Sequence, residues 1–248
     1  MLAAVAISVL VGAFAQRITG MGFALVASPA LVILLGPFDG VIVVNLCAVV
    51  SSLIILPRVW KFVEWRRFTM LALPALAGTV VGAVIAAHVP GAPLQVVIGA
   101  LVIVALTVTL LVTRAEHVMR GWPPALGAGA ASGIMNAAAG VGGPALSVYA
   151  VATRWPQPRF AATAQPYFVV IGAASLVLKL AQTGWAIPEL APGSWPIVIG
   201  SVLAGLVLGE VLHRRIPHHA ARIAVIAIAY AGGAAALIDG AIELWFSA

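Results

Sequence analysis

Hydrophobic residues run along this chain in long blocks, and short polar segments separate the blocks. Most blocks are about 20 residues long, the length that a helix needs to cross the roughly 30 Å hydrocarbon core of a membrane. The segments 36–40 and 179–193, the second of which contains Lys179, are expected to be loops. The pattern predicts membrane-crossing helices over residues 41–56, 68–88, 94–113, 160–178, 194–212 and 220–246.

Two further apolar blocks, residues 2–35 and 123–153, are interrupted near the middle by glycines. The interruptions read Gly20-Met21-Gly22 and Gly140-Val141-Gly142-Gly143. Glycine loses the most backbone freedom when a helix forms, so each block is expected to break there. The arms are about 15 residues, or roughly 22 Å of helix, which is short for a membrane crossing. Because lipid cannot satisfy freed backbone groups, both breaks should be buried in protein or should line a cavity.

The two broken blocks belong to halves that match at a constant offset of 120 residues. The matching pairs are Gln16 with Asn136, Gly20 with Gly140, Gly22 with Gly142, and Asn45 with Gln165. Broken segments in corresponding positions of two halves are typical of the binding site of a secondary transporter. We therefore predict an all-α polytopic membrane protein with two repeats, residues 1–120 and 121–248, each a glycine-broken helical hairpin followed by three transmembrane helices.

The placement of basic residues decides whether a broken block crosses the membrane once or returns to its starting side. With single crossings, the basic loops divide almost evenly between the two sides. With hairpins, all basic loop residues except Lys179 share one side, namely Arg58, Lys61, Arg66, Arg67, Arg114, Arg120, Arg154, Arg159, Arg214, Arg215 and Arg222. Cytoplasmic loops are rich in Lys and Arg, so we adopt the hairpins and place both termini outside. The two repeats are then inverted, and the short arms favour re-entrant hairpins.

The composition agrees with a membrane protein and excludes other classes. The chain of 248 residues is 63% hydrophobic and 8% charged, whereas soluble domains carry about 25% charged residues. The net charge of +6 comes from short loops, which indicates topology rather than a nucleic-acid partner. The single cysteine, Cys47, excludes an internal disulfide framework and a multi-thiolate metal site, and we expect no cofactor. The lack of His-Glu-x-x-His and Gly-x-Ser-x-Gly motifs counts against hydrolysis, and we do not expect an enzyme.

The chemistry expected at the breaks is the binding of a small anion. A helix begins after each glycine run, at Phe23 and near Pro144, and a helix start carries free N–H groups and a positive partial charge. Two such starts that face each other would form an anion site. Arg17, the one charged residue expected deep in the membrane, would add a cation suited to oxyanions. The candidate substrate-binding residues are Gln16, Arg17, Thr19, Gly20, Gly22, Asn45, Asn136, Gly140, Gly142, Gly143 and Gln165.

These features also have structural interpretations. Glycines in membrane helices often serve close packing, which we expect of Gly78 and Gly82. Arg17 could reach the membrane interface instead of an anion. Asn45 and Gln165 could link helices by hydrogen bonds alone. Cys47 is expected to be a small buried residue, with a sulfur relay as the alternative.

Two stretches resemble the glycine-rich repeats of the TauE/SafE sulfite exporter family. They are Gly20-Met21-Gly22 through Ser28-Pro29-Ala30-Leu31, and Gly140-Val141-Gly142-Gly143-Pro144-Ala145-Leu146. The first copy departs from the family pattern, because it has Phe23-Ala24 where further glycine is usual and its proline comes late, at Pro29. The resemblance implies transport of a small sulfur-containing oxyanion, such as sulfite, sulfoacetate or a related organosulfonate, across the bacterial inner membrane, more often as export.

Together, the residues and the resemblance predict a secondary transporter that works by alternating access around the paired breaks. Its partners would be the lipid bilayer and a small inorganic or organic anion, and a homodimer stays open as an assembly. The alternatives are an uptake permease, a channel, or a sulfur-relay membrane protein that uses Cys47. Asp39, Glu210 and Asp239 are expected near the ends of spans, so no carboxylate proton relay is evident. The membrane potential alone would suffice to drive an anion out of the cell.

Overall fold

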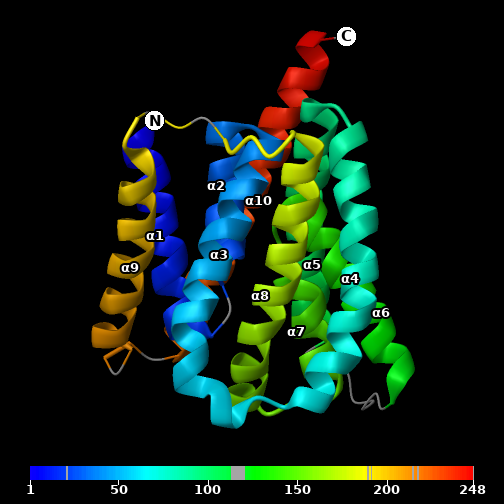
Figure 1. Cartoon of the computed structure of the whole chain (residues 1–248), viewed down its shortest axis with the longest axis vertical. Helices are drawn as coiled ribbons and strands as arrows, with labels where there is room; N and C mark the ends of the chain where they lie inside the picture. The colour runs from blue at the N-terminus through cyan, green and yellow to red at the C-terminus, as the bar shows by residue number, and fades with distance from the viewer. Residues whose placement is uncertain are drawn as a thin grey trace.

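The long apolar blocks of the sequence form helices, because a helix satisfies its backbone N–H and C=O groups within one segment. The computed structural model (Figure 1) describes residues 1–20, 22–112, 121–188, 190, 192–213, 215–216 and 218–247. Its elements are α1 (Leu2–Thr19), α2 (Phe23–Leu35), α3 (Pro37–Val59), the 3-10 turn η1 (Trp60–Phe62), α4 (Trp65–His88), α5 (Gly91–Val112), α6 (Trp122–Ala139), α7 (Gly143–Ala152), α8 (Gln157–Gln182), α9 (Ser194–Leu212) and α10 (His218–Ser247).

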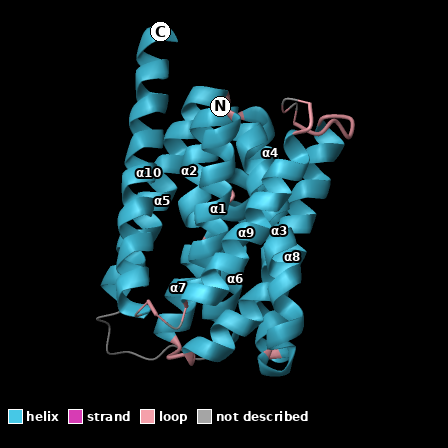
Figure 2. Ribbon diagram, turned by 90° about the vertical axis from the view of Figure 1, so that its left-hand side faces the viewer, coloured by secondary structure: helices cyan, strands magenta, loops and turns pink. Residues whose placement is uncertain are grey.

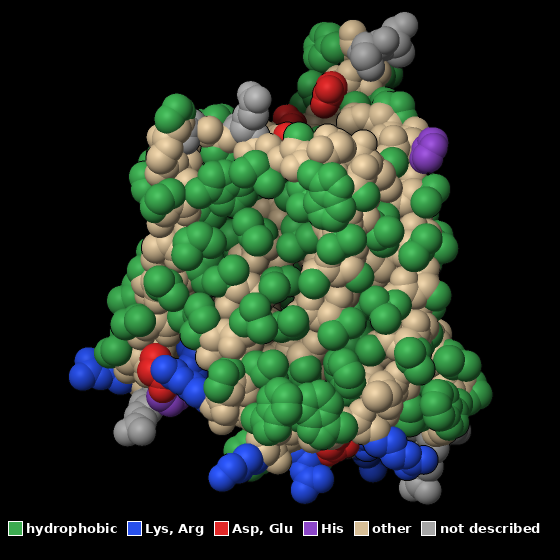
Figure 3. Space-filling model, in the orientation of Figure 1, with side chains coloured by type: hydrophobic (Ala, Val, Ile, Leu, Met, Phe, Trp, Pro, Cys, Tyr) green, Lys and Arg blue, Asp and Glu red, His purple; other side chains and the backbone are tan. Residues whose placement is uncertain are grey.

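The predicted all-α polytopic class is confirmed for the part of the chain that the structure describes. No strand occurs among these residues, and 7 of the helices are long and apolar enough to cross a membrane. Helices α2 and α7 are shorter and apolar. Large hydrophobic side chains cover the flank of the bundle in Figure 3, as a surface that faces lipid tails requires.

The two ends of the bundle differ in charge. Both chain termini lie at one end, which we call the terminal end (Figure 1). Lys and Arg side chains gather at the opposite end, which we call the basic end (Figure 3). Helix α10 extends beyond the other helices at the terminal end (Figure 2). This separation of charge along the bundle is the pattern expected of hairpins rather than of single crossings.

Each glycine break turns the chain back on itself. Helices α1 and α2 pack against each other, and Gly12 of α1 lies against Phe23 and Ala27 of α2. Helices α6 and α7 also pack against each other. In Figure 1, α1 starts at the terminal end and α2 returns to it, whereas α6 starts at the basic end and α7 returns there. The two hairpins therefore enter the bundle from opposite ends.

Several helices are longer than the sequence indicated. Helix α3 begins at Pro37 rather than Val41, because proline in the first turn gives up no helical hydrogen bond. The expected loop 36–40 is thus mostly helix. Helix α8 runs to Gln182, so Lys179 lies inside it rather than in a loop. The basic residues Arg114, Arg120 and Arg214 and the acidic Glu189 lie outside the described residues.

Packing between the helices follows a pattern of exchange between the two halves. Helix α1 packs on α9, and α6 packs on α4. Helix α2 packs on α10, and α7 packs on α5. Helix α3 packs on α8, and α5 packs on α10. These contacts are repeated when the five helices of one half are exchanged for the five of the other, whereas the contact of α2 with α3 has no equally extensive counterpart between α7 and α8.

The closest of these contacts, between α4 and α6, depends on small residues. A Cβ atom added to Gly78 or Gly82 of α4 would collide with the carbonyl oxygens of Ala130 and Ile134 in α6. A Cβ atom on Gly133 of α6 would likewise collide with the Ala75 carbonyl of α4. The packing role expected of Gly78 and Gly82 is confirmed, since membrane helices gain stability by such close approach of their backbones.

We predict that Gly133→Ala lowers the free energy of unfolding by about 1–3 kcal/mol, because the new methyl group must force α4 and α6 apart. The measurement is the thermal unfolding midpoint of the purified protein in detergent. Gly127→Ala in the same helix is the matched control, because nothing lies within 4 Å of a Cβ atom at Gly127. Equal midpoints for the two variants would contradict the prediction.

Candidate functional site at the glycine breaks

The two breaks have the same local geometry. Helix α1 ends at Gly20, which has φ 78°, and the Gly20 N–H donates to the Gln16 carbonyl at 2.8 Å. Helix α6 ends at Gly140, which has φ 72°, and the Gly140 N–H donates to the Asn136 carbonyl at 2.8 Å. Glycine is favoured in this left-handed conformation because it has no Cβ atom. Gly20 and Gly140, which correspond in the two halves of the sequence, therefore cap α1 and α6 in the same way.

A new helix starts directly after each break. Helix α2 begins at Phe23, and α7 begins at Gly143 with Pro144 in its first turn. The first N–H groups of a helix have no partner within it, and they give this end a positive partial charge. Phe23 and Gly143 both line one central cavity, so both helix starts border the same space.

The second break contacts helix α2 of the first hairpin. The hydroxyl of Ser28 in α2 donates to the carbonyl of Ala139, the last residue of α6, at 2.6 Å. A Cβ atom on Gly140 would lie 3.0 Å from the Val44 side chain and 3.4 Å from the Ser28 hydroxyl. The second break therefore packs against α2 and α3, and the direct meeting of the two breaks stays a prediction.

Amide and hydroxyl groups from α3 and α8 hold the first break. The Gln16 Nε2 donates to the Ser52 hydroxyl at 3.1 Å and to Gln165 Oε1 at 3.3 Å. The Ser51 hydroxyl donates to Gln16 Oε1 at 2.8 Å. Gln165 also donates from Nε2 to the Gly20 carbonyl at 3.1 Å. All of these side chains are buried. Their polar groups therefore form hydrogen bonds with one another, in place of the bonds to water that they would make outside the apolar bundle.

A corresponding group holds the second break. The Asn136 Nδ2 donates to Asn45 Oδ1 at 2.9 Å. The Asn45 Nδ2 donates to the Val41 carbonyl at 3.1 Å and to the Ser175 hydroxyl at 3.3 Å. Asn45 of the first half therefore supports the second break, and Gln165 of the second half supports the first.

Between the breaks lies a cavity of about 30 Å³, which has room for water but not for a solvated oxyanion. The cavity is therefore nearly closed in this conformation. Its lining contains no carboxylate and no cation. The lining residues are Gln16, Gly22, Phe23, Ala24, Leu25, Asn45, Ala48, Ser52, Asn136, Gly140, Gly143 and Phe168.

The structure brings most of the predicted site residues together. Those that line the cavity are Gln16, Gly22, Asn45, Asn136, Gly140 and Gly143. Gly20 and Gln165 lie next to it through the hydrogen bonds described above. Gly142 packs on Ser132, whose hydroxyl donates to the Gly142 carbonyl at 2.7 Å. The Thr19 hydroxyl donates back to the Ala15 carbonyl at 2.8 Å.

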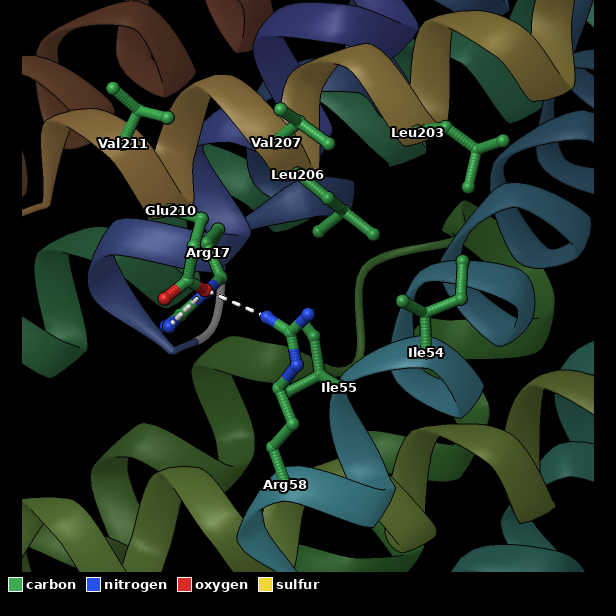
Figure 4. Close-up of a pocket in the computed structure, with 9 residues that line it drawn as sticks. All are labelled: Arg17, Ile54, Ile55, Arg58, Leu203, Leu206, Val207, Glu210 and Val211. Atoms are coloured by element: carbon green, nitrogen blue, oxygen red, sulfur yellow. Dashed lines mark hydrogen bonds and ion pairs between the residues drawn. The ribbon is translucent and has the colours of Figure 1, made fainter.

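Arg17 lies elsewhere, in a separate cavity of about 150 Å³ near the basic end (Figure 4). Its Nε donates to Glu210 Oε2 at 2.6 Å, and Arg58 Nη1 contacts the same oxygen at 2.8 Å. One carboxylate of α9 thus binds two guanidinium groups, from α1 and α3. The other lining residues are Ile54, Ile55, Leu203, Leu206, Val207 and Val211. Arg17 is therefore not a lining residue of the central cavity, and its contact with an anion stays a prediction.

Sequence reasoning missed the serines of the site. Ser52 lies two helical turns from Asn45, on the same face of α3, and this spacing could have identified it. Ser28 and Ser175 gave no signal, because their partners are in distant parts of the chain.

Cys47 is buried and packs in an apolar cluster with Val9, Leu31 and Val43. It is not among the residues that line the central cavity. The described residues contain no group of three or more His, Cys, Asp or Glu side chains that could hold a metal ion.

A family model described as Sulfite exporter TauE/SafE matches residues 4–236, which is most of the chain. The chain therefore belongs to this family, as its glycine-rich stretches indicated, and is a multi-pass membrane protein of a transporter family. No curated protein and no solved structure matches it.

We predict that Arg17→Ala slows transport because Glu210 loses one of its two guanidinium partners, and that the double variant Arg17→Ala with Glu210→Ala restores most of the rate. The double variant removes the contact between α1 and α9 as a whole, and the remaining Arg58 is largely exposed, so water can solvate its charge. The measurement is initial anion flux in vesicles that contain equal amounts of each variant. If the double variant stays as slow as Arg17→Ala, Arg17 contacts the anion directly.

Proposed function

We propose that the protein is a secondary transporter that moves a small sulfur-containing oxyanion, such as sulfite, sulfoacetate or a related organosulfonate, by alternating access around the central cavity. The observation that carries this proposal is the convergence of two helix starts on one cavity at the meeting point of the two hairpins. The sulfur chemistry comes from the family, and the preference for an anion comes from the site.

The cavity has the chemistry of a weak oxyanion site. Two helix starts direct positive partial charge into it. The amide groups of Gln16 and Asn136 can donate hydrogen bonds to anionic oxygens. No carboxylate among the lining residues would repel an anion. A site built from dipoles rather than full charges binds an anion with modest affinity. Modest affinity suits a transporter, because the anion must also be released.

An inverted repeat is the architecture that alternating access would use here. Most of the extensive helix contacts, among them those of α1 with α9 and α4 with α6, survive exchange of the two halves. Hydrogen bonds also join corresponding positions with different groups: the Ser51 hydroxyl donates to Gln16 Oε1 at 2.8 Å, and the Ile171 backbone carbonyl accepts from Asn136 Nδ2 at 3.5 Å. These observations support two related halves that rock against each other around the cavity.

We assign the basic end to the cytoplasm of a bacterial inner membrane and the terminal end to the outside, because cytoplasmic loops are enriched in Lys and Arg. Export then follows the potential, since the negative interior pushes an anion outward. A sulfur relay through Cys47 finds no support, because this thiol is enclosed by apolar side chains away from the cavity.

The test of this function is flux of sulfite and sulfoacetate in proteoliposomes, where a transporter shows saturation and counterflow and a channel shows neither. We predict that Gln16→Leu slows flux by about tenfold or more, because a hydrogen bond to a charged group contributes roughly 1.5–3 kcal/mol. Gln182→Leu is the matched control, since Gln182 is exposed at the far end of α8. Equal loss in both variants would remove the cavity from the mechanism.

We also predict that an imposed membrane potential alone drives net flux. Moving one charge across 100 mV is worth about 2.3 kcal/mol, which corresponds to an equilibrium ratio of about fiftyfold for a monovalent anion. Vesicles with a potassium diffusion potential and no pH gradient provide the measurement. Flux that requires a pH gradient and ignores the potential would show obligatory proton coupling instead.

A further inference from the structure

Lys179 is a cation buried within the membrane-spanning part of the bundle. Its side chain is 0% exposed, and its Nζ makes no hydrogen bond to any described residue. The ammonium lies 4.1 Å from the centre of the Phe38 ring, in a cation–π contact. A buried charge without hydrogen bonds is costly, and in a membrane protein such residues mark ion and substrate routes.

A helix start and a carboxylate lie near Lys179. Phe38 belongs to the first turn of α3, so the ammonium lies at the positive end of that helix. Asp39 in the same turn interacts electrostatically with Lys179. The Asp39 carboxylate therefore balances only part of the positive charge of the Lys179 ammonium and the α3 helix start. The remaining positive charge would attract a further anion.

Lys179 also lies next to the central cavity along α8. Ser175, one helical turn before it, accepts a hydrogen bond from Asn45, which lines the cavity. One turn of helix is about 5.4 Å. Helix α3 starts and α8 ends at the terminal end (Figure 1), so Lys179 lies on the side of the cavity that faces this end.

We propose that Lys179 and the first turn of α3 form an outer oxyanion subsite, which the transported anion occupies between the central cavity and the terminal end of the bundle. This inference rests on the proposed transport function and adds a second place to its route. Asp39 competes with the bound anion for Lys179, so the anion is released rather than trapped. Because Lys179 is fully enclosed in this conformation, α3 and α8 must separate at the terminal end for the subsite to open.

The main test is flux of sulfoacetate in proteoliposomes that contain the full chain. Lys179→Met should slow flux by at least tenfold when flux is normalised to the amount of folded protein in the vesicles, because the subsite loses its cation. Lys179→Arg should keep part of the rate. Lys61→Met is the matched control, because Lys61, the other lysine of the chain, is exposed at the basic end, and it should transport normally. Wild-type flux in Lys179→Met would overturn the subsite.

A second variant separates the subsite from a purely structural ion pair. If Lys179 only balances Asp39, the double variant Asp39→Asn with Lys179→Met should recover the wild-type rate, and that recovery would overturn the proposal. If Lys179 binds the anion, the double variant should stay slow. Stabilisation of Lys179→Met by sulfoacetate should persist, because the central cavity is intact. A wild-type protein that neither moves nor is stabilised by sulfite or sulfoacetate would instead refute the transport function itself, and the subsite with it.

A direct readout uses the small number of amines. In a Lys61→Arg background, Lys179 is the remaining lysine, and an impermeant amine reagent added at the terminal end should modify it during turnover. Saturating sulfoacetate should reduce this modification, as read by mass spectrometry of the peptide. Unchanged modification in the presence of the anion would contradict occupancy of the subsite.

Discussion

The structure depends on the need of every backbone N–H and C=O group inside lipid to find a partner. A helix broken at Gly20 or Gly140 exposes such groups, and no lipid can satisfy them. Both breaks therefore border one cavity inside the bundle, and polar side chains from α2, α3 and α8 donate hydrogen bonds to carbonyl groups at or next to the breaks. The same polar side chains that satisfy the backbone groups at the breaks also line or border the central cavity.

The same hydrogen bonds supply the chemistry and the conformational change that the proposed transport requires. The polar groups that it offers are helix starts, amides and hydroxyls, which favour an anion without holding a permanent charge against it. Support for each break comes from the other half of the chain, through Asn45 and Gln165. A movement of one half against the other must therefore remake the bonds at both breaks together, which is a natural basis for two discrete conformations.

The charged residues of the membrane region have separate roles. Arg17, Arg58 and Glu210 form a partly exposed cluster near the basic end, where each charge has a partner within hydrogen-bonding distance. Lys179 is buried toward the terminal end without a hydrogen bond among the described residues. The first arrangement fastens α9 to α1 and α3. The Lys179 ammonium is desolvated beside the helix start of α3, and a bound anion would lower the energy of this buried charge.

The sequence by itself determined the class of fold, the two glycine breaks and the matched pairs around them, because hydrophobic block length and glycine placement act locally along the chain. Arg17 and Lys179 show where this reasoning ends. Lys179 was expected in a loop, but α8 continues past its expected end and contains it. Arg17 has Glu210 of α9 as a partner, which its position along the chain did not indicate. Partners from distant segments and the extent of a helix depend on packing in three dimensions, which no local pattern contains.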